Sequence, residues 1–356
     1  MPPADERAKE ALDTVIRKAR VHFYKPIQIA EILFHHRTDG RLNLARLETY
    51  RNISKRWRDE VSNRLVGRRS TSSARYQDDV FNKNAMPPRS LAVLGEINER
   101  TGGGVEVYIY GAMREKLSAI LHVREYIARA TPETFSIQEL VDQFVSRPGL
   151  RRSTDKIYEI AVHALFSTIV HALRAEITLS INNEDEEILA DFERFIEMVL
   201  GINAERTRIV MPAALYRVGV TNAADRGLDM WANFGTAIQV KHLTLTPELT
   251  EEIVGGIEAD RIVIVCRDAE REPIEALLLQ LGLNERVQGI ITLSDLDQWY
   301  ALCLGERYRE RLAGSLLADL GREFDAEFPS NIEIGPFMRE RRYDTIALPE
   351  GWGQPE

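Results

Sequence analysis

The six residues Arg261-Ile-Val-Ile-Val-Cys266 constrain the fold of this 356-residue chain more than any other segment. A continuous β-branched run without polar alternation is typical of a strand buried on both faces. Such a strand needs helices above and below its sheet, so the run predicts a layered α/β protein.

The segments after residue 150 alternate between helix-like and strand-like patterns. Two predicted helices come first, and three strand-like segments follow them before the pattern returns to helix, strand, helix, strand and helix. The predicted fold class is α/β, with a mixed sheet between helices. The helices are expected at about 154–174, 184–200, 247–257, 277–281 and from 294, and the strands at 214–220, 228–232, 236–243, 261–266 and 287–292.

The residues before Arg147-Pro-Gly149 are predicted to be mainly helical, and one part of them is strongly basic. Between Arg41 and Arg75 ten Arg and Lys residues stand against three acids, although the whole chain has a net charge of −9. Such a segment suits a selective polyanion binder, while a solvated helix face explains the charge equally well. The predicted division is a basic helical region, residues 1–148, and an α/β domain, residues 149–356.

Several function classes are disfavoured by what the sequence lacks. No apolar run is long enough to span a membrane, the first residues do not resemble a signal peptide, and the two cysteines, Cys266 and Cys303, stand far apart. We therefore expect a cytoplasmic protein. Thr101-Gly-Gly-Gly104 lacks the Lys-Ser/Thr of a P-loop and predicts a turn, so no nucleotide cofactor is expected, and Tyr108-Ile-Tyr-Gly111 predicts a strand.

The residues that could carry chemistry lie on two neighbouring predicted strands. A tight turn at Asn233-Phe-Gly235 would make these strands antiparallel and bring Asp229 near Gln239 and Lys241. Alternation then places Gln239 and Lys241 on one face, with the side chain of Val240 in the core. The Asp229 carboxylate, the Gln239 amide oxygen and the Val240 carbonyl are oxygen ligands of the kind that Mg²⁺ accepts.

Lys241 is the residue of this group that suits proton transfer and charge stabilisation. It is the only lysine after Lys156 in a chain with 38 arginines, and only an amine can lose its proton near neutral pH. A lysine that merely snorkels at a strand end remains the alternative. A further carboxylate is expected from the preceding helix, where Glu193 is the candidate and Glu197 and Glu176 are its rivals.

The Asp229…Gln239-x-Lys241 arrangement resembles the PD-(D/E)xK nuclease superfamily, and the wider sequence looks like type II restriction endonucleases of the HaeII-like group. The resembling stretches are 24–33, 47–50, 72–78 and 225–241. The resemblance implies a PD-(D/E)xK-type mixed sheet flanked by helices, with a DNA-recognition region before it. Asp229 would be the metal aspartate, Gln239 would stand at the acid position where Asp or Glu is usual, and Lys241 would be the catalytic lysine.

The activity implied by the resemblance is Mg²⁺-dependent hydrolysis of both strands of DNA at a short, GC-rich palindrome. The enzyme would be a cytoplasmic homodimer of a restriction-modification system, and a water activated by the metal would attack the phosphodiester. Six basic residues are the candidates for DNA phosphates: Arg51, Lys55, Arg56, Arg58, Arg68 and Arg69. Two alternatives remain, a DNA-binding protein on an inactive nuclease fold and a repair or junction nuclease of the same fold.

Overall fold

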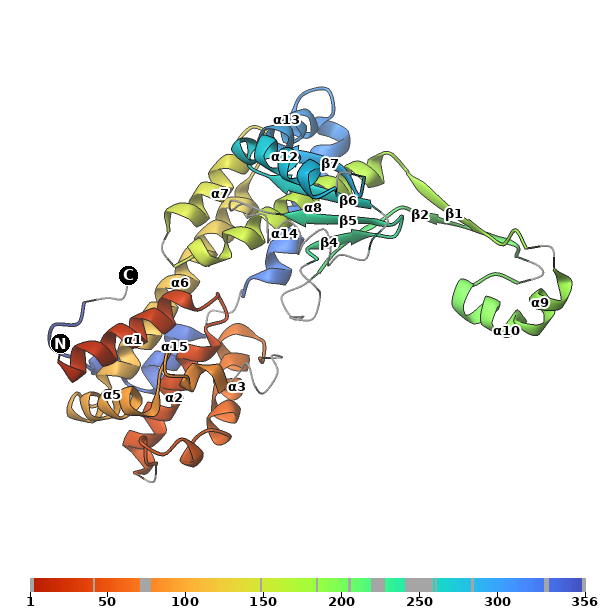
Figure 1. Ribbon diagram of the computed structural model, residues 1–356. Helices are drawn as coiled ribbons and strands as arrows, with labels where there is room; N and C mark the ends of the chain where they lie inside the picture. The colour runs from red at the N-terminus through yellow and green to blue at the C-terminus, as the bar shows by residue number, and fades with distance from the viewer. Residues whose placement is uncertain are drawn as a thin grey trace. The chain divides into compact units, whose positions relative to one another are not determined.

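The computed structural model describes residues 3–40, 42–70, 78–147, 149–183, 185–203, 206–218, 228–240, 259, 261–282, 285–329 and 333–353. They form two compact units (Figure 1). The first unit contains residues 1–160, 219–224 and 320–356, and the second contains 161–218 and 225–319. The predicted division at 148/149 does not coincide with these units, because the last part of the chain returns to the first unit.

The first unit is helical, as its amphipathic segments predict. Its longest helix, α6, carries Tyr108 to Gly111, so the strand expected there is wrong; burial of Tyr108, Ile109 and Tyr110 in a helix core explains the apolar run. The helices are α1 (Ala4–Lys18), α2 (Tyr24–Asp39), α3 (Ile53–Val66), α5 (Pro88–Arg100), α6 (Gly104–Arg129), α7 (Ile137–Ser146) and α15 (Ile334–Glu340). Short 3-10 turns are η1 (Leu47–Thr49), η2 (Asp79–Phe81), η3 (Arg151–Ser153) and η6 (Tyr343–Thr345).

The turn predicted at 101–104 is confirmed and begins α6. Gly102 and Gly103 have φ angles of 64° and 118°, which side chains with a Cβ rarely adopt. The Thr101 hydroxyl accepts the backbone N–H of Gly104, which satisfies one of the free donors at the start of the helix.

Two ion-paired carboxylates lie at the centre of the first unit. Glu31 is 1% exposed and accepts two hydrogen bonds from Arg341, of 2.7 and 2.8 Å. Glu106 is fully buried and accepts two from Arg37, both of 2.9 Å. The Tyr343 hydroxyl donates to Glu106 at 2.7 Å, so residues more than 200 positions apart share one network.

The second unit contains a five-stranded mixed sheet, which confirms the predicted fold class. The strand order is β3-β4-β5-β6-β7; β3, β4 and β5 are antiparallel neighbours, whereas β5, β6 and β7 run parallel. The strands are β3 (Leu215–Arg217), β4 (Met230–Ala232), β5 (Thr236–Val240), β6 (Arg261–Cys266) and β7 (Val287–Thr292). The helices are α12 (Arg271–Leu281) and α13 (Leu293–Leu304), with the 3-10 turn η5 (Asp268–Glu270).

The core of this sheet lies where the sequence predicts it. Every residue of β5 is buried, and Ile262 and Ile264 of β6 pack with Ala237 against Ile274 and Leu278 of α12. Two long helices, α8 (Thr154–Ala172) and α14 (Arg309–Glu327), contain the boundaries between the units. The predicted helix at 247–257 lies outside the described residues.

A two-stranded ribbon, not foreseen in the sequence, leads to the helices between residues 181 and 203 (Figure 1). Strands β1 (Glu176–Ser180) and β2 (Arg208–Pro212) pair antiparallel, with Glu176 opposite Pro212 and Ser180 opposite Arg208. The single helix expected at 184–200 is instead α9 (Glu186–Asp191), α10 (Glu193–Phe195) and the π-helical turn η4 (Ile196–Leu200). We call Glu176–Pro212 the arm.

Candidate active site

The hairpin of β4 and β5 brings Asp229 and Gln239 together, as their spacing predicts. Met230 pairs with Ile238 and Trp231 with Ala237, which places Asp229 and Gln239 opposite each other one step further along. Gly235, with a φ of 85°, lies in the turn that joins the strands.

The Asp229 carboxylate is held by Gln239, which the sequence analysis placed beside it, and by the backbone of Val240. Its Oδ2 accepts a hydrogen bond from the Gln239 side-chain amide and another, of 2.8 Å, from the backbone N–H of Val240. The Val240 side chain is buried, and so is every other residue of β5, so burial does not distinguish the two faces of this strand. The carboxylate is therefore fixed in position by the next strand, which suits a group that must present its oxygens in one direction.

Gln239 is fully buried, and its Oε1 has no hydrogen-bond partner among the described residues. A buried carbonyl oxygen without a donor is costly, and such an atom often marks a site that another group completes. Together with the Asp229 carboxylate it offers two hard oxygens, so these residues fit a divalent cation such as Mg²⁺. Among the described residues no cluster of three or more His, Cys, Asp or Glu side chains could hold a metal.

The structure does not show the other predicted site residues next to Asp229. Lys241 lies outside the described residues. Glu193 is exposed in α10, and its rivals Glu197 and Glu176 are also exposed on the arm. The helix that precedes the five-stranded sheet, once the arm is set aside, is α8, whose Glu159 is 3% exposed and paired with Lys156.

The structure shows an aromatic pair beside Asp229 that the sequence analysis did not predict. Tyr216 of β3 and Trp231 of β4 are paired in register, and their rings stack at 4.5 Å while each residue stays 44% exposed. Trp231 follows Asp229 by two residues, so alternation places both on one face of the sheet. The signal in the sequence was an aromatic residue in each of two predicted strands.

The six predicted phosphate contacts differ widely in their surroundings. Arg56 is exposed, with Glu60 3.7 Å away, and Arg69 is exposed as well. Arg51 and Lys55 each lie 2.8 Å from Asp78, which neutralises part of their charge. Arg68 is half-buried and donates to the Ala326 carbonyl.

Arg58 requires a correction. It is 2% exposed, and its guanidinium donates to Asp59 at 2.7 Å and to the Gln28 side chain at 3.2 Å. A side chain enclosed in this way holds α3 against α2 and does not reach a DNA phosphate from this position. Counting charges along the sequence did not predict the burial of Arg58, because solvated and buried arginines contribute equally to such a count.

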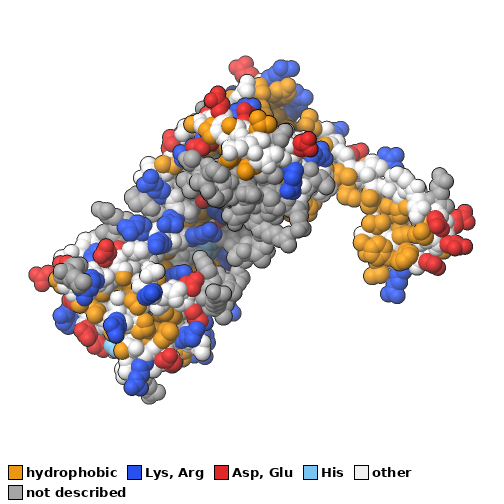
Figure 2. Space-filling model, viewed as in Figure 1, with side chains coloured by type: hydrophobic (Ala, Val, Ile, Leu, Met, Phe, Trp, Pro, Cys, Tyr) orange, Lys and Arg blue, Asp and Glu red, His pale blue; other side chains and the backbone are white. Residues whose placement is uncertain are grey.

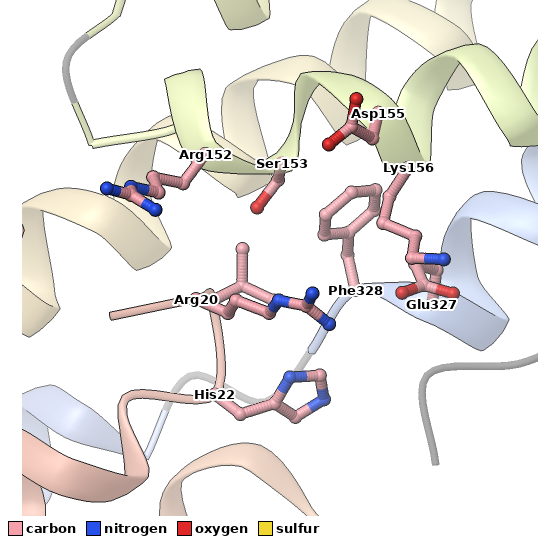
Figure 3. A pocket seen from close by; sticks show the side chains of 9 residues that line it. Arg20, His22, Arg152, Ser153, Asp155, Lys156, Glu327 and Phe328 are labelled. Carbon is pink, nitrogen blue, oxygen red and sulfur yellow. The ribbon is translucent and has the colours of Figure 1, made fainter. Parts of the chain in front are cut away.

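A pocket in the first unit gathers basic side chains from distant parts of the sequence (Figure 3). Arg20, Arg152 and Lys156 line it with Asp155 and Glu327, so positive charge is in slight excess. His22 also lines it; burial first, and then the Arg68 and Arg20 charges, lower the pKa of its imidazole to about 4. Sequence spacing gave no sign of this pocket, because the three segments that line it, 20–22, 152–156 and 327–328, lie more than 100 positions apart.

A mixed sheet whose central hairpin presents a carboxylate defines an α/β protein of nuclease type. Residues 8–343 match the family model described as HaeII restriction endonuclease. The chain is 48% identical to the type II restriction enzyme HaeII of Haemophilus aegyptius, over 95% of this chain and 96% of the relative. It is 47% identical to the type II restriction enzyme NgoBI of Neisseria gonorrhoeae, over 96% and 97%.

The chain belongs to the HaeII restriction endonuclease family. The resemblance inferred from the sequence and the expected enzyme class, a site-specific deoxyribonuclease, are therefore confirmed. No solved structure matches the chain. Within the described part of the chain, no helix has both the length and the apolar character needed to cross a membrane.

Proposed function

We propose that this protein is the type II restriction endonuclease of a restriction-modification system, a cytoplasmic homodimer that cuts both strands of DNA at a short, GC-rich palindrome. The observation that carries the proposal is the family match over residues 8–343. The hairpin supports it, since Asp229 and Gln239 meet on adjacent strands as a phosphodiesterase site of this type requires. Two free, buried cysteines suit a reducing compartment.

The proposed centre consists of Asp229, Gln239, the Val240 carbonyl and Lys241. Asp229 and Gln239 would hold Mg²⁺, and the ion would supply charge stabilisation to the pentavalent phosphorus and lower the pKa of water. The contacts of Asp229 with Gln239 and Val240 hold its carboxylate in one orientation. Lys241, on the face that alternation assigns to Gln239, would orient the attacking water or take its proton.

Recognition is proposed to lie mainly in the basic helical part. Arg56 and Arg69 are exposed and suit contacts with phosphates, and Arg51, Lys55 and Arg68 would contribute after exchanging their present partners. Arginine also reads guanine in the major groove through two hydrogen bonds, so 38 arginines against eight lysines favour a GC-rich site. Glu193 remains a proposed extra carboxylate only if the arm of a second molecule brings it to the site.

Digestion of unmethylated plasmid DNA tests this function. The purified protein should give discrete fragments in Mg²⁺ and intact DNA in EDTA, and the mapped fragment ends should share one palindrome. Intact DNA that shifts in mobility equally in Mg²⁺ and EDTA would indicate a binding protein on an inactive nuclease fold. Cleavage confined to branched or damaged DNA would indicate a repair nuclease.

A further inference from the structure

The tip of the arm has an apolar face that no other part of the described chain covers. Six of its side chains are between 45% and 72% exposed. We call these residues the arm face: Ile188, Phe192, Phe195, Met198, Val199 and Val210. Ile202 is the only buried residue among those described between 181 and 203.

The arm face is a continuous stripe and not a scatter of surface residues. Ile188 of α9, Phe192 between α9 and α10, Phe195 of α10 and Val199 of η4 follow one another at intervals of three or four residues, so the arm face runs across all three short helical elements. Hydrophobic side chains gather on one side of the tip and acidic ones on the other (Figure 2). An apolar side on short helical elements is normally covered by another element, because burial of that side is what stabilises such helices.

Charge excludes a nucleic acid or an anionic membrane as the cover. Residues 181–201 contain seven Asp and Glu residues and one Arg. Phosphate groups would be repelled by such a tip, and helices that lie on anionic lipid carry Lys and Arg beside their apolar side. The cover is therefore a protein surface.

We propose that the arm face of one molecule packs against the arm face of a second copy of this chain. This rests on the proposed function, since cuts in both strands of a palindrome require two active sites related by two-fold symmetry. The arm and Asp229 belong to the second unit of the chain. Pairing of the arms would therefore join the second units of two molecules, each of which carries one proposed cutting site.

The size of the arm face suits a dimer. Two aromatic and four aliphatic side chains at these exposures present roughly 600 Å² of apolar surface, the upper end of the roughly 300–600 Å² of the largest patch on a typical monomer. Two such faces together would remove about 1,200 Å² from water, the lower end of the range for specific interfaces. The acidic side of each tip would stay in solvent, so like charges would not oppose each other across the interface.

Sedimentation of the full-length protein tests the proposal. The wild type should have twice the 40.6 kDa mass of the chain at micromolar concentration. The variant with Phe195→Asp and Met198→Asp should have the mass of a single chain, with a dissociation constant raised at least about 100-fold. The matched control is Leu279→Asp, which changes a 70% exposed leucine of α12 and should leave the dimer intact.

If the double variant does not fold, disulfide trapping of the dimer through cysteines placed on the arm face still tests the proposal. Phe192→Cys, Phe195→Cys and Met198→Cys are made singly; both native cysteines are buried. Oxidation should give a covalent dimer for at least one of them and none for Leu279→Cys. A monomeric wild type, a folded double variant that stays dimeric, or no trapped dimer from any arm cysteine would overturn the proposal.

Cleavage by the same preparations separates this proposal from the proposed function. A wild-type protein that dimerises through the arm but leaves DNA intact would refute the function and leave the arm face as the dimer contact. A wild-type protein that cuts both strands while the arm variants sediment unchanged would refute the arm and leave the function.

Discussion

At the Asp229–Gln239 contact a carboxylate faces a neutral amide, where two carboxylates would repel each other. The amide donates to Asp229, and within the part of the chain that the structure describes its oxygen remains as an acceptor without a partner. The hairpin is therefore stable without a cation and still provides oxygen atoms for one. If Gln239 holds the proposed acid position of the metal site, this contact accounts for how a glutamine can stand there.

Gln239→Glu tests this account of the amide. Without metal the variant should unfold at a lower temperature than the wild type, because a buried carboxylate would lie beside the half-buried carboxylate of Asp229. The added negative charge should lower the Mg²⁺ concentration for half-maximal cleavage about ten-fold, equivalent to about 1.4 kcal/mol. Thermal unfolding in EDTA and a Mg²⁺ titration of cleavage measure the two effects. Gln239→Leu is the control, and an unchanged Mg²⁺ requirement in Gln239→Glu would argue against a metal at this position.

Arg56 and Arg58 form a matched pair two residues apart on α3. Arg56→Ala should weaken DNA binding and reduce the slope of log affinity against log salt by about one, because an exposed phosphate contact is lost. Arg58→Ala should lower the free energy of unfolding by about 3 kcal/mol, because it removes the partner of Gln28 and Asp59. Fluorescence anisotropy at several salt concentrations and urea unfolding measure the two properties. Reversed effects would show that the two arginines had been assigned the wrong roles.

At the scale of elements, α2, α6 and the C-terminal residues are joined by the Glu31 and Glu106 network. Arg341→Met should destabilise the protein by about 3–5 kcal/mol, since it leaves the Glu31 carboxylate buried without its cation. The control is Arg124→Met on α6, whose partner Asp325 is about half exposed, and it should cost less than about 1 kcal/mol. Equal losses for the two variants in urea unfolding would mean that the buried ion pair stabilises the unit no more than the exposed pair does.

The turn between α1 and α2 should make stability depend on pH through His22. The pKa of this histidine is lowered to about 4 in the folded chain, so between pH 6.5 and 4 the unfolded chain binds a proton that the folded chain does not. Stability should therefore fall as the pH drops through this window, by on the order of 3 kcal/mol. His22→Asn should lose less stability over the same range. A parallel decrease in both proteins would rule out His22 as the cause.

At the scale of the whole molecule, local sequence patterns predicted the five-stranded sheet. They did not predict contacts between residues that are far apart in the sequence. The β-branched run of β6 and the Asn233-Phe-Gly235 turn determine strand placement and register within a few neighbouring residues. The strands of the arm alternate only between exposed and half-buried residues, and about 30 positions separate them, so neither periodicity nor burial marks them. The return of Arg341 to Glu31 is equally invisible to a local pattern.

Only the part of the candidate site that depends on residues close together in the sequence was predicted. Asp229 and Gln239 share one hairpin, so their contact follows from alternation and a tight turn. The extra carboxylate depends on how a distant helix packs, and the helix chosen for Glu193 belongs to the arm. Arg56 and Arg58 differ in the solvent exposure of their side chains, which cannot be predicted from the charge pattern of the sequence.

The central claim, that the β4–β5 hairpin is the cutting centre, is tested most directly by Asp229→Asn. Cleavage of plasmid DNA in Mg²⁺ should fall by at least about 1,000-fold, because the fixed carboxylate is lost, while DNA binding in EDTA stays near the wild-type value. The control is Asp268→Asn, in an exposed residue after β6 that accepts the backbone N–H of Ser294 at 3.3 Å, and this variant should cut normally. Full cleavage by folded Asp229→Asn would contradict the account and place the chemistry elsewhere in the molecule.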